Sequence, residues 1–492
     1  MSTSLRAPAR CAPSADAAPP RPRGSAAWLV VLVLAVALVP FVQELTHQPA
    51  VRYAQSAALV EDGSVRLDRF EGVVGVDRLE RDGHLYGDKA PFQPLLGAPA
   101  YAAARLVGAE PATVLRPTGN LGLWWVTLWS TVVPLLAIAF LGVKVSERVV
   151  GRASAAQGTL AICAGTLLFA YGSQLYAHVL AALLGWACWL LIDRSHREVR
   201  SGGHPLRWAL AAGAVGGAAV ATEYPMAIVL LAMAAALFVE QGWSRLAAFA
   251  AGAAPFGLLL AAYQAAAYGS PFAVSYGAKP YHPEGTSILD LPSPDRFAEV
   301  LLGPRGLLLF SPVVVLAVWG LVRLARSADE DRRRHGAVGL AMVAGFVVLQ
   351  ASWLNPWGGE SYGPRYLIPC LPFLIVGMAE VWERAVDVRF VIVTWSVLAM
   401  SSAVVAEHLV PAGALPMAAQ LQSLRTDGAV PTLWTMAFGP IGWLLQAATI
   451  GAAGLLLHRH LAADRAASSG EVDRTTPITR ESVVPPLALP ST

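Results

Sequence analysis

Apolar runs of about 20 residues recur along the chain, and they limit its fold more than any other feature, because a helix of about this length crosses a bilayer core. Twelve spans are predicted, at approximately 27–46, 120–142, 154–172, 176–193, 207–222, 226–240, 246–267, 306–322, 336–354, 365–382, 390–408 and 433–457. The sequence therefore predicts an all-α polytopic membrane protein, with an uncleaved first helix rather than a signal peptide.

Composition supports this class and excludes several functions. Of 492 residues, 55% are hydrophobic and 14% charged, and the mean hydropathy is +0.52. The four cysteines show neither C-x-x-C nor Cys/His spacing, so neither a disulfide framework nor a zinc site is indicated. Walker and H-E-x-x-H motifs are absent from the sequence, which argues against an ATP-driven machine. Nothing in it indicates a nucleic-acid partner.

Basic residues follow alternate connections between the spans. They include Lys144, Arg148 and Arg152, then 194–207, Arg245, 323–334, Arg384 and Arg389. By the positive-inside rule these connections are cytoplasmic, as are both termini. We therefore expect a multi-pass protein of a bacterial plasma membrane, with a disordered tail at 1–26, a membrane domain at 27–458 and a second disordered tail at 459–492. The long loops 47–119, 268–305 and 409–432 are then extracytoplasmic, and an active site is expected on that face.

The first outer loop holds the most unusual polar chemistry. Two stretches, 50–61 and 91–107, are typical of amphipathic helices that lie along a membrane surface. Asp77, His84, Asp88 and Lys89 lie between them, and the whole chain contains only three lysines. Lys89 can hold a phosphate, and a neighbouring carboxylate can take a proton from a hydroxyl. The alternative is a solvated loop in which Asp88 and Lys89 cap the next helix.

Other charged residues are predicted at outer ends of spans. Arg365 in "WGGESYGPRYLIP" and Arg305 in "GPRGLLLFSP" each follow Gly-Pro at the start of a span, where an anion could bind; snorkelling arginines are the alternative. Glu223 in "ATEYP" would be costly at the hydrocarbon edge unless paired, which makes it a functional candidate. His178 in "LYAHVL" is a candidate too, although a packing role is the simpler interpretation.

These segments, taken together and in order, resemble the GT-C membrane glycosyltransferases, in particular bacterial members related to protein O-mannosyltransferases and lipid A aminoarabinose transferases. The resemblance covers roughly residues 28–400 and is carried by "VRYAQSAALVEDGSV" (51–65), "YGDKAPFQPLLGAPAY" (86–101), "YGSQLYAHVLAALLGWA", "ATEYP", "GPRGLLLFSP" and "WGGESYGPRYLIPCLPF". It implies transfer of a sugar from a polyprenyl-phosphate donor, with Lys89, Arg365 and Arg305 around the donor phosphate. Arg52 of the first motif is a further candidate.

The sequence departs from the family at one informative place. Family members commonly carry an acidic pair before the Arg-Tyr-Ala helix, and here Pro49 and Ala50 occupy those positions. A catalytic carboxylate must then come from Asp77 or Asp88, or else from Glu44 or Glu223. An acceptor that is already an anion would need no base, and an inactive member is also consistent.

We therefore expect a glycosyltransferase that moves a hexose or pentose to a lipid, glycan or protein acceptor of the cell envelope. Membrane lipids and the lipid-linked donor are the expected partners. No cofactor is expected, although a divalent metal ion is not excluded. A multi-span transporter or lipid flippase is the alternative from another class, and such proteins favour charges in mid-helix and repeated halves.

Overall fold

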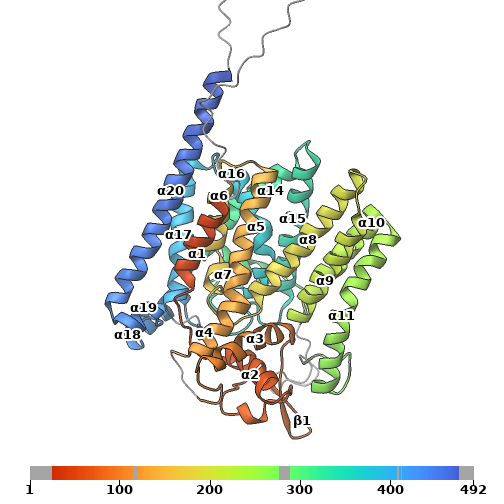
Figure 1. Cartoon of the computed structure of the whole chain (residues 1–492), viewed down its shortest axis with the longest axis vertical. Coiled ribbons are helices and arrows are strands. Elements are labelled where there is room, and N and C mark those ends of the chain that lie inside the picture. The colour runs from red at the N-terminus through yellow and green to blue at the C-terminus, as the bar shows by residue number, and fades with distance from the viewer. Residues whose placement is uncertain (1–24, 115–118, 276–288, 407–408, 412, 476–492) are drawn as a thin grey trace, which may run out of the picture.

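The computed structural model describes residues 25–114, 119–275, 289–406, 409–411 and 413–475. In Figure 1, long helices run side by side through the body of the molecule. At one end of this bundle, drawn at the bottom, lie α2 (His47–Glu61), α3 (Phe92–Leu106) and a small hairpin of β1 (Arg78–Arg81) and β2 (His84–Gly87). We call this the α2–α3 end of the molecule.

Each of the twelve predicted ranges contains helical segments, although the first, 27–46, is helical only as far as Leu38. In the first half these are α1 Ser25–Leu38, α4 Leu121–Thr127, the π-helical turn η2 Leu128–Val132, α5 Val133–Val149, α6 Ala155–Gly165, α7 Leu167–Ala170, α8 His178–Arg200, α9 Pro205–Thr222, α10 Met226–Gln241 and α11 Trp243–Tyr268. In the second half they are α12 Pro294–Leu302, α13 Leu307–Phe310, α14 Val313–Ala325, α15 Glu330–Ser352, the 3₁₀ helix η4 Arg365–Phe373, α16 Leu374–Val381, α17 Val386–Val405, α18 Pro416–Thr426, α19 Leu433–Phe438 and α20 Ile441–Thr475.

Length and apolarity together identify fewer crossings than the sequence predicts. Among the described residues, 5 helices are long and apolar enough to cross a membrane: Leu121–Val149, Trp243–Tyr268, Glu330–Ser352, Val386–Val405 and Ile441–Ala467. The count rises to 6 if the segments Pro294–Phe310 and Val313–Ala325, which are bent by 96°, form one span. The chain is thus a multi-pass membrane protein, but the predicted number of twelve spans is not confirmed.

Several predicted spans are interrupted within the bundle. Thr166 adopts an extended conformation between α6 and α7, and its hydroxyl accepts a hydrogen bond from the Leu168 amide. Pro369 and Pro372 lie inside η4, where each removes a backbone donor that a regular α-helix needs. Apolar side chains continue through both breaks, so hydropathy alone predicts unbroken helices there.

Close packing of α8, α9 and α11 sets the positions of the ends of these three helices. Gly213 and Gly217 of α9 lie against the backbone of α11 at Phe249 and Ala253, where there is no room for a side chain. This contact fixes the direction of both helices. As a result the start of α8, the end of α9 and the carboxyl end of α11 meet beside the α2–α3 end.

The two helices predicted at 50–61 and 91–107 form, but α2 does not have the expected one-sided character. Its side chains from Gln48 to Ala58 are buried on all sides, because α3, α4 and β2 pack around it. Ser56 approaches α3 closely and donates a hydrogen bond to the Pro94 carbonyl at 3.0 Å. α3 buries one face only. Whether the two helices lie along a membrane surface stays a prediction.

The hairpin pairs Arg78 with Gly87 and Arg81 with His84 in antiparallel register. Asp68, in η1 (Asp68–Phe70), holds β2 by accepting hydrogen bonds from the Leu85 amide at 2.7 Å and from the His84 ring at 2.8 Å. Burial alone would raise the pKa of Asp68, but these hydrogen bonds outweigh it and lower the pKa below the ordinary value. The hairpin thereby leads the chain into the segment that follows β2.

The last helix is longer than the sequence predicts. α20 continues to Thr475, beyond the expected end of the membrane domain at 458, and in Figure 1 it projects past the other helices. Residues 458–467 are rich in alanine and contain neither Gly nor Pro, so nothing stops the helix there. His460 and Asp464 pair one turn apart at 3.3 Å, and Arg465 pairs with Glu383 at 3.1 Å. Of the predicted disordered tails at 1–26 and 459–492, residues 1–24 and 476–492 lie outside the described residues, whereas 459–475 belong to α20.

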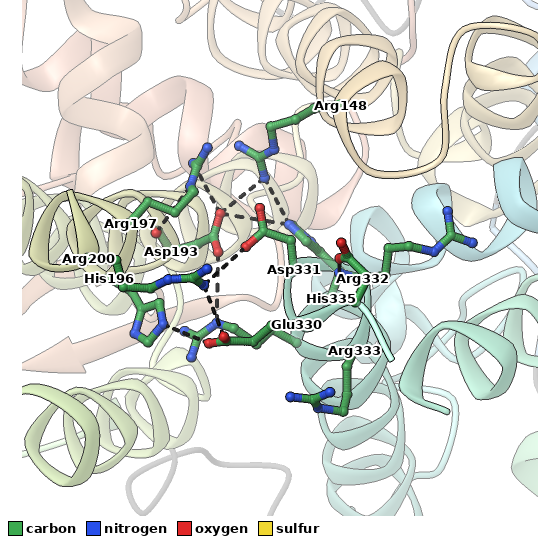
Figure 2. A network of polar contacts seen from close by, with 12 residues as sticks. Arg148, Asp193, His196, Arg197, Arg200, Glu330, Asp331, Arg332, Arg333 and His335 are labelled. Carbon is green, nitrogen blue, oxygen red and sulfur yellow. Dashed lines mark hydrogen bonds and ion pairs between the residues drawn. The ribbon is translucent and has the colours of Figure 1, made fainter. Parts of the chain in front are cut away.

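A network of charged side chains joins α5, α8 and α15 away from the α2–α3 end (Figure 2). Asp193 of α8 is fully buried at its centre, 3.1 Å from both Arg148 and Arg197, and Arg148 also contacts His335 of α15 at 2.9 Å. His196 and Arg200 each lie 3.1 Å from Glu330. Asp193 lies fifteen residues after the first residue of α8, which corresponds to about 22 Å along a helix. The network therefore connects these helices far from the first residue of α8.

Candidate active site

Lys89 lies between two carboxylates just after β2. Its Nζ donates hydrogen bonds to Asp88 Oδ2 at 2.8 Å and to Asp77 Oδ1 at 3.2 Å. Asp88 is fully buried and Lys89 is 8% exposed. The structure therefore brings together three of the predicted site residues, as one buried ion cluster rather than a solvated loop.

The carboxyl end of α11 holds the backbone of this cluster. Tyr263 and Tyr268 each donate a hydrogen bond to the Gly87 carbonyl at 2.8 Å, and the Ser275 hydroxyl donates to the carbonyl of Asp88. Gly87 also lies against the Gln55 side chain of α2, where a Cβ would collide with the amide group. Contacts from α2 and from the α11 region thus fix the backbone position from which the Lys89 side chain extends.

A small cavity of about 20 Å³ opens beside Lys89, enough for roughly one water molecule. The residues that line it come from α2, the segment after β2, the start of α8, the α9–α10 connection and η4: Gln48, Arg52, Lys89, Ala90, His178, Thr222, Glu223, Tyr224 and Tyr366. Arg52, Lys89, His178 and Glu223 were all candidates from the sequence. Tertiary packing places them around one space although they are up to 171 positions apart.

His178 and Glu223 form a pair in the wall of this cavity. His178 Nδ1 lies 2.8 Å from Glu223 Oε1, and the two side chains are almost completely buried. The imidazole stacks on Tyr176 at 5.9 Å between ring centroids and meets Tyr366 edge-on at 5.6 Å. Glu223 is thus paired, as a carboxylate at the edge of the hydrocarbon must be. His178 has a charged partner in addition to its packing against aromatic rings.

Arg52 and Arg365 bring positive charge to the same place. Arg52 of α2 is 2% exposed, and Arg365 opens η4 with its guanidinium 5.4 Å from the Tyr176 ring centroid. Both are near enough for their charges to act on Glu223. Tyr176 lies within reach of the charges of Arg365, Asp77 and Lys89. It therefore lies between the Lys89 cluster and the His178–Glu223 pair. Formal charge balances there: Arg52, Lys89 and Arg365 face Asp77, Asp88 and Glu223.

Five predicted residues are not part of the cavity lining: Asp77 and Asp88 contact Lys89, Arg365 lies beside Tyr366, and Arg305 and Glu44 lie elsewhere. The guanidinium of Arg305 donates hydrogen bonds to the backbone carbonyls of Ser361, Pro411 and Ala414. It therefore connects the chain before η4 to the segment after α17. Its donors are therefore already used for structure. Glu44 lies in the connection between α1 and α2 and is partly buried, but it is not part of the cavity lining.

Sequence reasoning missed several residues of the site. Tyr224 and Thr222 flank Glu223 and line the cavity, and their adjacency to that carboxylate was the available signal. Burial raises the pKa of the Tyr224 phenol, so Tyr224 keeps its proton at neutral pH and can donate a hydrogen bond. Gln48, Tyr366 and the two α11 tyrosines carry no pattern that distinguishes them in the sequence.

The described residues contain no group of three or more His, Cys, Asp or Glu side chains arranged to hold a metal ion. Asp77 and Asp88 share Lys89, and Glu223 is joined to His178, so each of the three carboxylates already has a cationic or imidazole partner. The expectation that the site works without a cofactor stays a prediction.

Comparison with known proteins gives the fold a precedent. No family model matches the sequence, and no curated protein matches it. Two crystal structures of ArnT from Cupriavidus metallidurans, one in the apo state and one bound to undecaprenyl phosphate, superpose with TM-scores of 0.51 and 0.50. Each is 16% identical to this chain, and the match covers 89% of this chain and 72% of ArnT.

An oligosaccharyltransferase from Archaeoglobus fulgidus is more distant, at 11% identity and a TM-score of 0.41 over 87% of this chain and 59% of its own. At that level it adds nothing to the argument. The ArnT matches extend over most of both chains and agree with the resemblance found in the sequence motifs. The chain has the fold of ArnT.

Proposed function

We propose that this protein transfers a sugar from a polyprenyl-phosphate donor to an acceptor of the cell envelope. The observation that carries the proposal is that Lys89 and Arg52 line one cavity, with Arg365 beside the lining residue Tyr366, in a chain with the fold of ArnT. One ArnT structure holds undecaprenyl phosphate, a lipid carrier of this chemical class. The fold and the cationic site therefore support the same substrate class from independent directions.

The proposed chemistry uses positive charge where negative charge develops. As the bond between the sugar and the phosphate breaks, the carrier phosphate leaves as an anion. Lys89 acts as a point charge toward it, and the guanidinium groups of Arg52 and Arg365 add fixed hydrogen-bond donors in a site with little water. Attack of the acceptor from the opposite side inverts the configuration of the sugar carbon.

Donor binding must rearrange the site. A sugar phosphate is much larger than a cavity of about 20 Å³, so side chains must separate as it enters. The phosphate would compete with Asp77 for Lys89, since that hydrogen bond is the longer of the two, at 3.2 Å against 2.8 Å. We place Lys89 as the residue that exchanges a carboxylate for the donor phosphate.

The proposal includes an orientation in the membrane. We place the α2–α3 end outside the bacterial plasma membrane and both termini in the cytoplasm, with the helix set completing twelve spans. Arg148, Arg197 and Arg200 belong to the charged network around Asp193 (Figure 2), about 22 Å along α8 from His178, and this concentration of basic residues supports the orientation through the positive-inside rule. A lipid, glycan or protein acceptor would then meet the site outside.

The test is transfer of label from undecaprenyl phosphate carrying a radiolabelled hexose or pentose, in membranes that contain the full chain. Replacing Lys89 by alanine is expected to lower the transfer rate by about 100-fold or more, which is typical for loss of a charge-stabilising donor. Lys144→Ala is the matched control, because Lys144 pairs with Glu147 on α5 and is not part of the cavity lining.

Wild-type rates in the Lys89→Ala membranes would contradict the phosphate role. Binding of undecaprenyl phosphate without any transfer would contradict the transferase and favour an inactive GT-C-like protein. Movement of the intact lipid across vesicles, without loss of its sugar, would instead identify a flippase.

A further inference from the structure

The His178–Glu223 pair is the part of the cavity that donor-phosphate binding leaves unused. Its two members come from different elements, the first residue of α8 and the residue directly after α9. Both line the cavity, and Nδ1 and Oε1 are 2.8 Å apart. A buried imidazole with a carboxylate on one nitrogen is the arrangement in which the other nitrogen accepts a proton.

The contact with Glu223 determines which nitrogen is available. An ionised carboxylate only accepts hydrogen bonds, so the 2.8 Å contact favours the neutral tautomer with its proton on Nδ1 and its lone pair on Nε2. Among the described residues, neither ring nitrogen of His178 meets the geometry of a hydrogen bond, and Nδ1 is the nitrogen that lies at ion-pair distance from a carboxylate, which leaves Nε2 without a partner. His178 therefore presents a basic nitrogen in the wall of the cavity that also holds Lys89.

The surroundings keep this ring in place and limit its charge. Tyr176 stacks on one face at an interplanar angle of 17°, while Tyr171 and Tyr366 meet the ring edge-on. The charged and titratable groups that face His178 are Glu223 from the α9–α10 connection, Arg52 from α2, Arg365 and Tyr366 from η4, and Tyr171 and Tyr176 from the segment before α8. Arg52, Arg365 and Glu223 thus place their charges around the ring from three different parts of the chain.

We propose that His178 is the general base of the transfer reaction and that Glu223 orients and stabilises it. In this step the acceptor hydroxyl gives its proton to His178 Nε2 as its oxygen bonds to the anomeric carbon. The bond from that carbon to the phosphate oxygen breaks, and its electron pair leaves with the polyprenyl phosphate beside Lys89. The imidazolium later releases its proton to water. This assignment rests on the proposed transferase function.

The other carboxylates are less suited to this role. Asp88 is fully buried and bonded to Lys89, and Asp77 is bonded to the same ammonium. Both carboxylates are therefore joined to the ammonium group that is proposed to hold the donor phosphate. Glu223 also lines the cavity, but it is joined to His178 by the 2.8 Å contact, so we assign Glu223 the supporting role and His178 the role of base.

The experiment uses membranes containing the full chain and undecaprenyl phosphate carrying a radiolabelled hexose or pentose, with endogenous acceptors. His178→Gln is expected to lower kcat by about 100- to 10,000-fold with little change in the donor KM, the range for loss of a general base. Glu223→Gln should lower kcat by less, since His178 remains. In wild type, kcat should rise with pH until His178 is neutral, and His178→Gln should lose that rise.

His84→Gln is the matched control, because His84 also pairs with a carboxylate, Asp68, at 2.8 Å but belongs to the hairpin and is not part of the cavity lining. It should keep wild-type kcat and the wild-type pH profile. A purely structural role for His178 would instead lower thermal stability and leave the pH profile unchanged, which overturns the proposal. If His178→Gln does not fold, a wild-type pH profile in Glu223→Gln overturns it as well.

Different results would contradict the role of His178 as base and the transferase function itself. Transfer by wild type with an undiminished kcat in His178→Gln removes the base and leaves the transferase. No transfer by wild type from either donor removes the transferase itself, and the base with it.

Discussion

Lys89 illustrates how the fold changes the meaning of a single residue. The sequence distinguishes it by the rarity of lysine and by its neighbour Asp88, and both a phosphate-binding role and a helix cap were consistent with that. The structure adds Asp77 as a second partner and buries the cluster beside Arg52. Asp77 precedes β1 whereas Asp88 follows β2, so only formation of the hairpin brings them together.

The two carboxylates are expected to respond differently to neutralisation. Asp77→Asn removes the weaker, partly exposed competitor for Lys89, so binding of undecaprenyl phosphate should tighten, by up to about tenfold, or 1.4 kcal/mol. Asp88→Asn removes the fully buried partner and should weaken both binding and thermal stability. The dissociation constant is measured by quenching of tryptophan fluorescence in detergent.

Asp82→Asn is the control for this pair of substitutions. Asp82 lies exposed at the turn of the same hairpin with a positive φ of 54°, a conformation that asparagine tolerates well. It should leave lipid affinity unchanged. Equal weakening by Asp77→Asn and Asp88→Asn would show that both carboxylates are structural.

At the scale of elements, the site depends on helix ends rather than on helix faces. His178 begins α8, Glu223 follows α9, and Tyr268 ends α11. Hydropathy located these helices well, because the length of an apolar run is a strong signal. It could not locate the interruptions at Thr166 or within η4, since those depend on local hydrogen bonding and on proline among apolar neighbours.

The α11 tyrosines should act as a shared clamp on the Gly87 carbonyl. Either Tyr263→Phe or Tyr268→Phe leaves the other hydroxyl in place, and each should have a modest effect on the donor KM. The double variant leaves a buried carbonyl without these donors, which costs about 1–3 kcal/mol, so the donor KM should rise by more than the product of the single effects.

Thermal unfolding and the donor KM of all four proteins in this cycle provide the measurement. Tyr362→Phe is the control, because it loses a buried hydrogen bond to the Ala399 carbonyl away from the cavity. Strictly additive effects on KM would show that the two tyrosines do not position Lys89 together.

Across the whole molecule, polar side chains gather in two places that are joined by the length of α8. The site contains His178 at the first residue of this helix, and the charged network contains Asp193 and Arg197 nearer its other end (Figure 2). The first set lines a cavity, whereas Asp193 ties α5 to α15 through Arg148 and His335. We therefore expect the network to act on stability rather than on chemistry.

Asp193→Ala is expected to destabilise the protein by about 3–5 kcal/mol, because it leaves the arginines around it without their buried counter-charge. Asp331→Ala removes a more exposed member of the same network and should cost about 1 kcal/mol or less. Thermal unfolding in detergent separates the two. A large loss of transfer activity in Asp193→Ala at unchanged stability would contradict a structural role.

The sequence by itself determined the class of this protein: apolar run lengths require a helical membrane protein, and the order of short motifs resembles that of the GT-C glycosyltransferases. It also supplied the charged candidates, since a carboxylate or histidine near an apolar span needs a reason to be there. Only the tertiary structure decided which of them belong together. Arg52, Lys89, His178 and Glu223 meet because α8, α9 and α11 pack closely and the hairpin folds over their ends, whereas Arg305 is used by backbone carbonyls. Contacts between distant segments depend on packing geometry, and no local pattern encodes that geometry.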